Sequence, residues 1–114
     1  MKDPVIYHIA EKIDWQRAQS SKSYSAPSLD SEGFIHFSTA EQIQPTYDSH
    51  FSGKTGVILL EVDAQAIGEC LKYEFVESRG EHFYHLYSPL HLGTILDTYE
   101  VTEGFISKFT ARFK

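Results

Sequence analysis

The sequence of 114 residues contains a single cysteine, Cys70, so no disulfide bond can form within the chain. A protein without disulfides is suited to a reducing compartment, and we expect it in the cytoplasm. The chain also lacks the run of roughly 18–20 apolar residues that a transmembrane helix needs. Its short apolar start, Val5 to Tyr7, is too brief for the core of a signal peptide. We therefore expect no membrane-spanning helix and no segment that is removed on maturation.

Positive charge is scarce as well. Ten Lys and Arg residues stand against sixteen Asp and Glu residues, which gives a formal net charge of −6. Double-stranded nucleic acids and anionic membranes both need a basic surface, so we exclude them as the main partner. The sequence also has no glycine-rich phosphate loop, dinucleotide fingerprint, nucleophile elbow or common zinc motif. Its function must therefore be sought in residues outside these motifs.

Aromatic side chains are present in excess. Eight Phe, seven Tyr and one Trp make up 14% of the residues, and six histidines are found among them. The length predicts one domain, covering residues 1–114, because domains usually have roughly 100–150 residues. The hydrophobic fraction of 41% is ordinary for a globular protein with its own core.

The pattern of apolar and polar residues predicts an α+β fold. Runs of β-branched and aromatic residues predict strands at Val5–Ala10, Phe34–Phe37, Val57–Val62, Leu71–Val76, Phe83–Tyr87 and Ile95–Val101. The third of these is the most apolar run in the chain, which indicates a central strand covered on both faces. We expect a single small domain with a mixed, mostly antiparallel sheet and two or three short helices.

Helix starts are indicated by capping residues. Asp14 is a candidate N-cap, and Thr39 with Gln42 fits a capping box that opens a second helix. Pro45 should break that helix or start a second short one that runs to Phe51. Asp63 is predicted to cap a helical turn over 64–67, whereas the tail after residue 104 fits either a helix or a strand.

Three histidines lie inside predicted strands: His8, His36 and His85. A buried imidazole needs a hydrogen-bond partner or a ligand, because an unpaired polar group in the core costs free energy. Each could be a core histidine bonded to the backbone or to a hydroxyl. Three together favour a shared polar cleft. Ser38 and Thr39 follow His36 directly, so two hydroxyls at a helix start suggest an anion or sugar site, although plain capping explains Thr39 equally well.

Metal and nucleophile alternatives have weaker support. His82 and His85 are three apart on a strand, so they point to opposite faces and do not chelate together. A zinc site built from His8, His36 and His85 stays open but has no sequence signature. Cys70 has no catalytic motif around it. Among the scattered carboxylates, Glu100 near the end of the last strand is the candidate catalytic acid.

A set of segments, taken in order, carries a family resemblance. They are Ile6–Ala10 with Trp15, Tyr24 with Ala26–Leu29, Glu32–Gln42, Leu59–Asp63, Tyr73–Glu74 and Phe83–Leu90. Together they resemble the domain of unknown function 952 family of small bacterial proteins, from about Val5 to about Val101. Tyr84 and Ser88 depart from the family pattern, which has Pro and Gly there, and neither change removes a candidate site group.

The resemblance implies a fold distantly similar to that of ADP-ribosyltransferases, with NAD as the cofactor. It implies that His8 and His36 hydrogen-bond the cofactor, that Tyr87 or Phe37 stacks on nicotinamide, and that Glu100 serves as the late-strand acid. His36 is then both a ligand-binding and a candidate catalytic residue. The alternatives are a non-catalytic module that binds a small molecule or a protein, and the histidine-based zinc site.

Overall fold

Strands and short helices alternate along the chain in the computed structural model, which describes residues 3–113. In chain order the elements are β1 (Val5–Glu11), α1 (Lys12–Ser21), β2 (Ser23–Tyr24), α2 (Pro27–Ser31), β3 (Ile35–Phe37), η1 (Ala40–Gln42), α3 (Ile43–His50), β4 (Val57–Asp63), α4 (Ala64–Ile67), β5 (Leu71–Val76), β6 (Glu81–Leu86), β7 (Leu90–His91), η2 (Leu92–Thr94), β8 (Ile95–Glu100) and α5 (Phe105–Ala111). This is the predicted α+β class, and within residues 3–113 no helix is long and apolar enough to cross a membrane.

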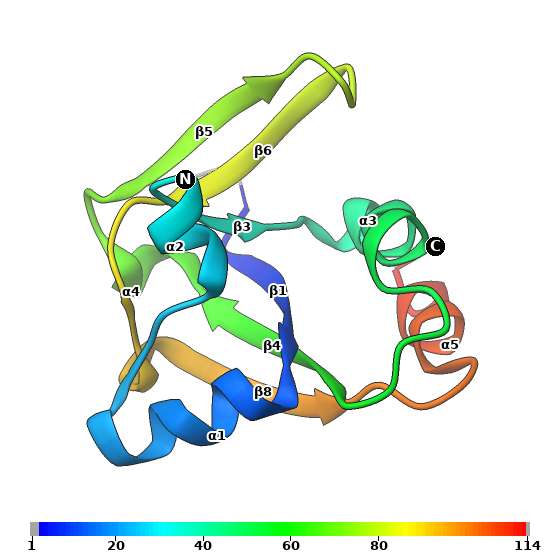
Figure 1. Cartoon of the computed structure of the whole chain (residues 1–114). Helices are drawn as coiled ribbons and strands as arrows, with labels where there is room; N and C mark the ends of the chain where they lie inside the picture. Colours follow the sequence, from blue (N-terminus) through cyan, green and yellow to red (C-terminus); the bar gives the residue numbers. More distant parts are fainter. Residues whose placement is uncertain (1–2, 114) are drawn as a thin grey trace.

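One sheet has the order β1-β4-β8, with β4 in the middle (Figure 1). Successive side chains of β4 point to opposite faces, and both faces are buried. Leu60 and Val62 belong to one apolar cluster, whereas Val57 and Leu59 belong to a second one beneath α3 and α5. The prediction of a central strand covered on both sides is therefore confirmed.

The second sheet has the order β3-β6-β5 and is joined to the first at one point. Tyr7 in β1 and Ser38 after β3 exchange both backbone hydrogen bonds, at 2.8 and 2.7 Å. The β5–β6 hairpin projects from this junction, and β5 forms its outer edge (Figure 1). Every strand pairing among the described residues is antiparallel, including the short β2–β7 pair, as the mostly antiparallel prediction requires. The prediction of one mixed sheet was wrong, because the described strands form two three-stranded sheets and this short pair.

The helix starts follow the sequence in part. Asp63 caps α4 by accepting hydrogen bonds from two backbone N–H groups, as predicted. The prediction that Asp14 is an N-cap was wrong: α1 begins at Lys12, directly after β1, and Asp14 lies in its first turn, where it pairs with Arg17. An acidic residue is stabilising there because it faces the positive end of the helix dipole. The short helix α2 was not predicted, although Pro27 at its first position is a typical start signal.

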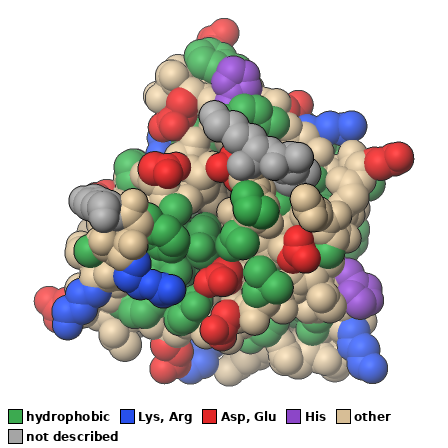
Figure 2. Space-filling model, turned by 180° about the vertical axis from the view of Figure 1, so that it is seen from behind, with side chains coloured by type: hydrophobic (Ala, Val, Ile, Leu, Met, Phe, Trp, Pro, Cys, Tyr) green, Lys and Arg blue, Asp and Glu red, His purple; other side chains and the backbone are tan. Residues whose placement is uncertain are grey.

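The segment after β3 is split as the proline indicated. Thr39 and Gln42 form the expected capping box at the start of η1, in which the Thr39 N–H donates to the Gln42 side chain at 3.0 Å. The chain then continues as α3, with Pro45 in its first turn, where a missing N–H costs nothing. The tail is a helix, α5, which packs beside α3 (Figure 1). From behind, apolar side chains gather in the middle of the surface among acidic ones (Figure 2).

Candidate functional site

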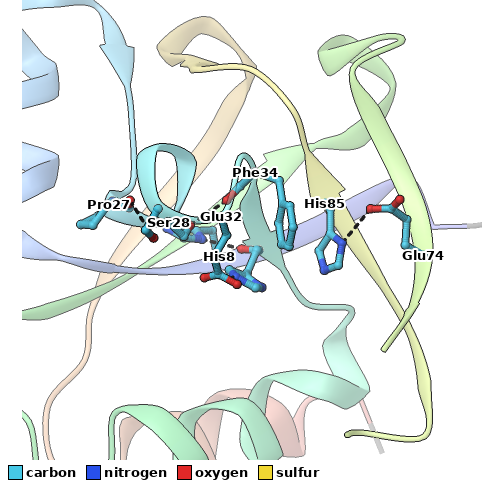
Figure 3. Close-up of polar contacts among 9 residues, drawn as sticks. His8, Pro27, Ser28, Glu32, Phe34, Glu74 and His85 are labelled. Atoms are coloured by element: carbon cyan, nitrogen blue, oxygen red, sulfur yellow. Dashed lines mark hydrogen bonds and ion pairs between the residues drawn. The ribbon is translucent and has the colours of Figure 1, made fainter. Parts of the chain in front are cut away.

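A cavity of about 560 Å³ opens where the two sheets meet. Its wall is built from β1, β2, α2, β3, α3 and the β5–β6 hairpin, so segments from most of the chain contribute to it. Five of the candidate site residues from the sequence line this one cavity: His8, His36, Phe37, Ser38 and His85. Figure 3 shows His8 and His85 on the two sides of Phe34. The structure therefore brings the three strand histidines together.

His8 is held by hydrogen bonds at both ring nitrogens. Its Nδ1 lies 2.6 Å from the backbone carbonyl oxygen of His36, which can only accept, so Nδ1 carries the proton. Nε2 then accepts from the Tyr24 hydroxyl at 2.8 Å. Burial lowers the pKa of His8 to about 4, which keeps the ring neutral at ordinary pH. His8 thus ties β1 to β2 and β3 and has no free nitrogen for a ligand.

His85 is held at one nitrogen only. Its Nδ1 lies 2.9 Å from Oε1 of Glu74, and only 7% of its side chain is exposed. The carboxylate places a proton on Nδ1, and in the neutral imidazole this leaves the lone pair on Nε2. Among the described residues, Nε2 of His85 is the one buried side-chain nitrogen or oxygen atom that has no hydrogen-bond partner. The Phe34 ring stacks on the imidazole at 4.0 Å between centroids (Figure 3).

Glu74 is the common acceptor for two neighbours. The Tyr87 hydroxyl donates to the same oxygen that His85 contacts. The hydrogen bond from Tyr87, followed by the one from His85, lowers the pKa of Glu74, so this carboxyl group is ionised at neutral pH. Tyr87 is exposed and its ring lies 5.3 Å from Phe34. It supports His85 through Glu74, and it is not among the described residues that line the cavity.

His36 is the most accessible of the three histidines. It sits opposite His85 in the β3–β6 register, with the two rings 5.3 Å apart and nearly perpendicular. About half of its side chain is exposed, and its Nε2 lies 3.1 Å from the Glu32 carboxylate. Because residues paired across strands share one face of a sheet, His36 and His85 present two imidazoles to the same side of the cavity.

The two hydroxyl residues after His36 have different surroundings. Ser38 lines the cavity and its hydroxyl donates to Thr46 in α3 at 3.3 Å. Thr39 is buried beside it, where its backbone N–H is bonded to Gln42 and its hydroxyl to Glu41. Thr39 therefore takes part in capping, and the structure does not bring it to the cavity wall.

Glu100 lies away from these residues. It ends β8, two thirds of its side chain is exposed, and it pairs with Lys12 at 2.7 Å. That lysine lowers the pKa of Glu100. Glu100 is not among the described residues that line the cavity, so the structure does not join the candidate acid to the histidines.

The geometry also gives no support to the zinc alternative. Within residues 3–113 no group of three or more His, Cys, Asp or Glu side chains is arranged to hold a metal ion. The reason is visible at His8, whose two nitrogens are already engaged by Tyr24 and a backbone carbonyl.

Sequence reasoning missed three important residues: Tyr24, Glu74 and Arg79. Tyr24 and Glu74 were named only within the segments that carry the family resemblance, with no role at the site. Pairing the predicted strands Leu71–Val76 and Phe83–Tyr87 as a hairpin would have identified Glu74 as a neighbour of His85. Lys72 pairs with His85, and Glu74, two residues along the same strand, lies on the same face of the sheet. Arg79 lies in the hairpin turn and lines the cavity, but no local pattern marks it.

The fold and the site together define a small α+β domain with a histidine-lined cavity at the junction of two antiparallel sheets. The family model described as protein of unknown function DUF952 matches residues 9–98. The chain belongs to this family, as its motifs indicated.

The chain is also similar to solved structures of protein CC0527 from Caulobacter crescentus. The crystal structure is 32% identical, with a TM-score of 0.80 and 86% of each chain covered. The solution NMR structure is 33% identical, with a TM-score of 0.73 and coverage of 86% of this chain and 84% of that one. No curated protein matches the chain. These findings support the α+β class, whereas similarity to the ADP-ribosyltransferase fold stays a prediction.

Proposed function

We propose that the cavity binds NAD or an ADP-ribose-like ligand and that His85 accepts a hydrogen bond from it. The observation that carries this proposal is the buried Nε2 of His85, which has a lone pair and no partner among the described residues. A buried acceptor without a partner costs roughly 1–3 kcal/mol. A ligand that supplies an O–H or N–H donor removes this cost on binding. Ribose hydroxyls and the nicotinamide carboxamide both have such donors.

The walls of the cavity suit a ligand with planar rings. Phe34 already stacks on His85, and Phe37 lies beside His8 with 5.5 Å between the ring centroids. Both phenylalanines line the cavity, as does the Tyr24 ring. Its volume of about 560 Å³ falls in the range of roughly 300–1,000 Å³ that is typical of pockets for small organic ligands. Aromatic walls with a few fixed polar groups are the usual composition of such sites.

The proposed activity is ligand binding. Transfer of the ADP-ribosyl group is the reaction that this class of ligand would allow. Breaking the bond between ribose and nicotinamide would need a group that stabilises the developing positive charge. Glu100, the candidate for that role, pairs with Lys12 outside the cavity. Of the three strand histidines, His36, with Glu32 beside it, is the one that remains accessible within the cavity.

Isothermal titration calorimetry with NAD and with ADP-ribose tests the proposal. The key variant is His85→Phe, which keeps a ring against Phe34 but removes the acceptor. The matched control is His82→Phe, since His82 lies on the same strand and is exposed. We expect wild type and the control to bind alike, and His85→Phe to bind at least about tenfold more weakly, the equivalent of roughly 1.4 kcal/mol.

Two results would contradict the proposal. One is the absence of any heat or thermal shift with wild type at millimolar concentrations of both ligands. The other is equal affinity for His85→Phe, His82→Phe and wild type, which would show that the free nitrogen of His85 takes no part in binding.

A further inference from the structure

The acidic residues that line the cavity have basic partners, whereas its arginine has no acidic partner among the described residues. Three acidic residues line it, and each has a basic partner: Glu11 pairs with Lys54 at 3.2 Å, Asp14 with Arg17 at 3.6 Å and Glu32 with His36 at 3.1 Å. Arg79 is the one Lys or Arg among the described residues that line the cavity, and within residues 3–113 it has no acidic partner. Arg79 is therefore a positively charged side chain of the cavity wall that no described carboxylate neutralises.

Arg79 is positioned by two contacts. Its guanidinium lies over the Phe83 ring at 4.6 Å, and its Nη2 donates to the Thr46 hydroxyl oxygen at 3.2 Å. The stacking fixes the plane of the guanidinium, while the bond to Thr46 fixes its direction toward α3. A guanidinium has five N–H donors, and this contact uses one of them. Most of its donor capacity is therefore left for a ligand.

Thr46 adds a second donor at the same place. Its hydroxyl oxygen accepts from Arg79 and also from Ser38, at 3.2 and 3.3 Å. Both contacts use lone pairs of the oxygen, and no hydrogen bond among the described residues uses the Thr46 hydroxyl proton. A hydroxyl that accepts twice can still donate once. Arg79 and Thr46 thus both line the cavity with donors that the described contacts leave unused, and an anionic oxygen is the acceptor that such a pair recognises best.

We propose that Arg79 and Thr46, with Ser38 behind them, form a phosphate-binding subsite at the end of the cavity between α3 and the β5–β6 turn. This subsite rests on the proposed function, because the phosphate that it binds belongs to the same ligand whose hydroxyl or amide group donates to His85. Planar guanidinium groups bind phosphate oxygens in pairs, which gives this end of the cavity a preference for phosphoryl groups over single-point anions such as chloride. The ligand class is thereby narrowed to phosphorylated compounds.

Titration of the isotope-labelled protein with pyrophosphate, followed by NMR, tests the subsite without any nucleoside present. We expect the Arg79 side-chain N–H signals and the Thr46 amide to shift, and the signals of Arg112 to stay in place. In calorimetry, Arg79→Gln should weaken pyrophosphate and ADP-ribose binding by about tenfold or more. Arg79→Lys keeps the charge but not the paired donors, so its affinity for both ligands should lie between those of wild type and Arg79→Gln.

The matched control is Arg112→Gln. Arg112 also lies over an aromatic ring, that of Phe109, but it is not among the described residues that line the cavity. This variant makes the same charge change and should bind pyrophosphate like wild type. Adenosine, which has no phosphate, should bind equally to wild type and to Arg79→Gln.

The outcomes separate this subsite from the proposed function. Pyrophosphate shifts at Arg79 without any response of His85 to NAD or ADP-ribose would uphold the subsite and reject the proposed ligand. ADP-ribose that shifts His85 but binds equally well to Arg79→Gln would reject the subsite alone. Wild type that shows no change at Arg79 or Thr46 in millimolar pyrophosphate overturns the subsite, and this result does not depend on any variant folding.

Discussion

The two three-stranded sheets of this protein each hold a buried histidine, and they use it differently. In the β1-β4-β8 sheet, His8 is bonded at both nitrogens and joins neighbouring strands. In the β3-β6-β5 sheet, His85 is bonded at one nitrogen to Glu74 and has the other free. The first sheet has its middle strand buried on both faces, whereas the second ends in an exposed strand, β5. Both sheets supply residues to the core, such as Leu60 in the first and Leu86 in the second, so we expect the edge strand β5 to contribute least to stability. We propose that the ligand is recognised in the second sheet, at His85.

The largest expected effect is a difference in the stability that the central strand β4 and the edge strand β5 contribute. Leu60 in β4 is fully buried, so Leu60→Ala should lower the free energy of unfolding by about 2–5 kcal/mol. Tyr73 in β5 is about half exposed, and Tyr73→Ala should cost about 1 kcal/mol or less. Urea denaturation of both variants measures the difference. Equal losses would show that the edge strand β5 contributes as much to stability as the central strand β4.

The two histidines should differ in the same way. His8→Phe leaves the His36 carbonyl and the Tyr24 hydroxyl without their partner, so it should cost about 2–4 kcal/mol of stability. His85→Phe removes one bond and also an unpaired acceptor, so its effect on stability should be much smaller, while its effect on ligand affinity should be large. Thermal unfolding of the two variants checks the predicted stabilities, and calorimetry checks the predicted affinities. Similar stabilities for the two would refute the distinction.

Stability should also depend on pH through His8. Its pKa is about 4 in the folded chain against an ordinary value of 6.5, so between these values the unfolded chain binds a proton that the folded chain does not. The contribution of His8 is therefore complete above pH 6.5 and is lost as the pH falls toward 4, by roughly 1.4 kcal/mol per unit. Subtracting the pH profile of His8→Phe from that of wild type isolates this slope, and a flat difference would contradict the neutral, buried state of His8.

The smallest effect is expected at Glu100. Its pair with Lys12 is exposed, and exposed ion pairs contribute little to stability. Glu100→Gln should leave both the melting temperature and the affinity for ADP-ribose unchanged. A marked loss of affinity would place Glu100 in the site after all, in line with the family resemblance.

Much of the fold could be predicted because it is governed by local patterns. The apolar run of β4, the Asp63 cap and the alternation in β5 each appear directly in the sequence, and the structure has them at nearly the predicted bounds. The start of α1 was misplaced because β1 runs straight into the helix without a capping side chain. Local propensity cannot show such a junction, since tertiary packing decides it.

The candidate site was predictable as a set of residue types and not as an arrangement. Burial of imidazole in strands pointed to His8, His36 and His85. Which of them is free depends on partners far along the chain, such as Tyr24 for His8, and on the hairpin register that brings Glu74 to His85. Arg79 reaches Thr46 only through the fold of the hairpin over α3. Long-range contacts of this kind leave no periodicity in the sequence.

The most direct test of the central claim is a long-range proton–nitrogen NMR correlation of the histidine rings, recorded with and without ADP-ribose. We predict that His8 and His85 both have their proton on Nδ1 in the free protein. Added ADP-ribose should shift Nε2 of His85 strongly and leave Nε2 of His8 in place. A proton on Nε2 of the free His85, or a His85 signal that saturating ADP-ribose does not move, would contradict the assignment of His85 as the ligand acceptor.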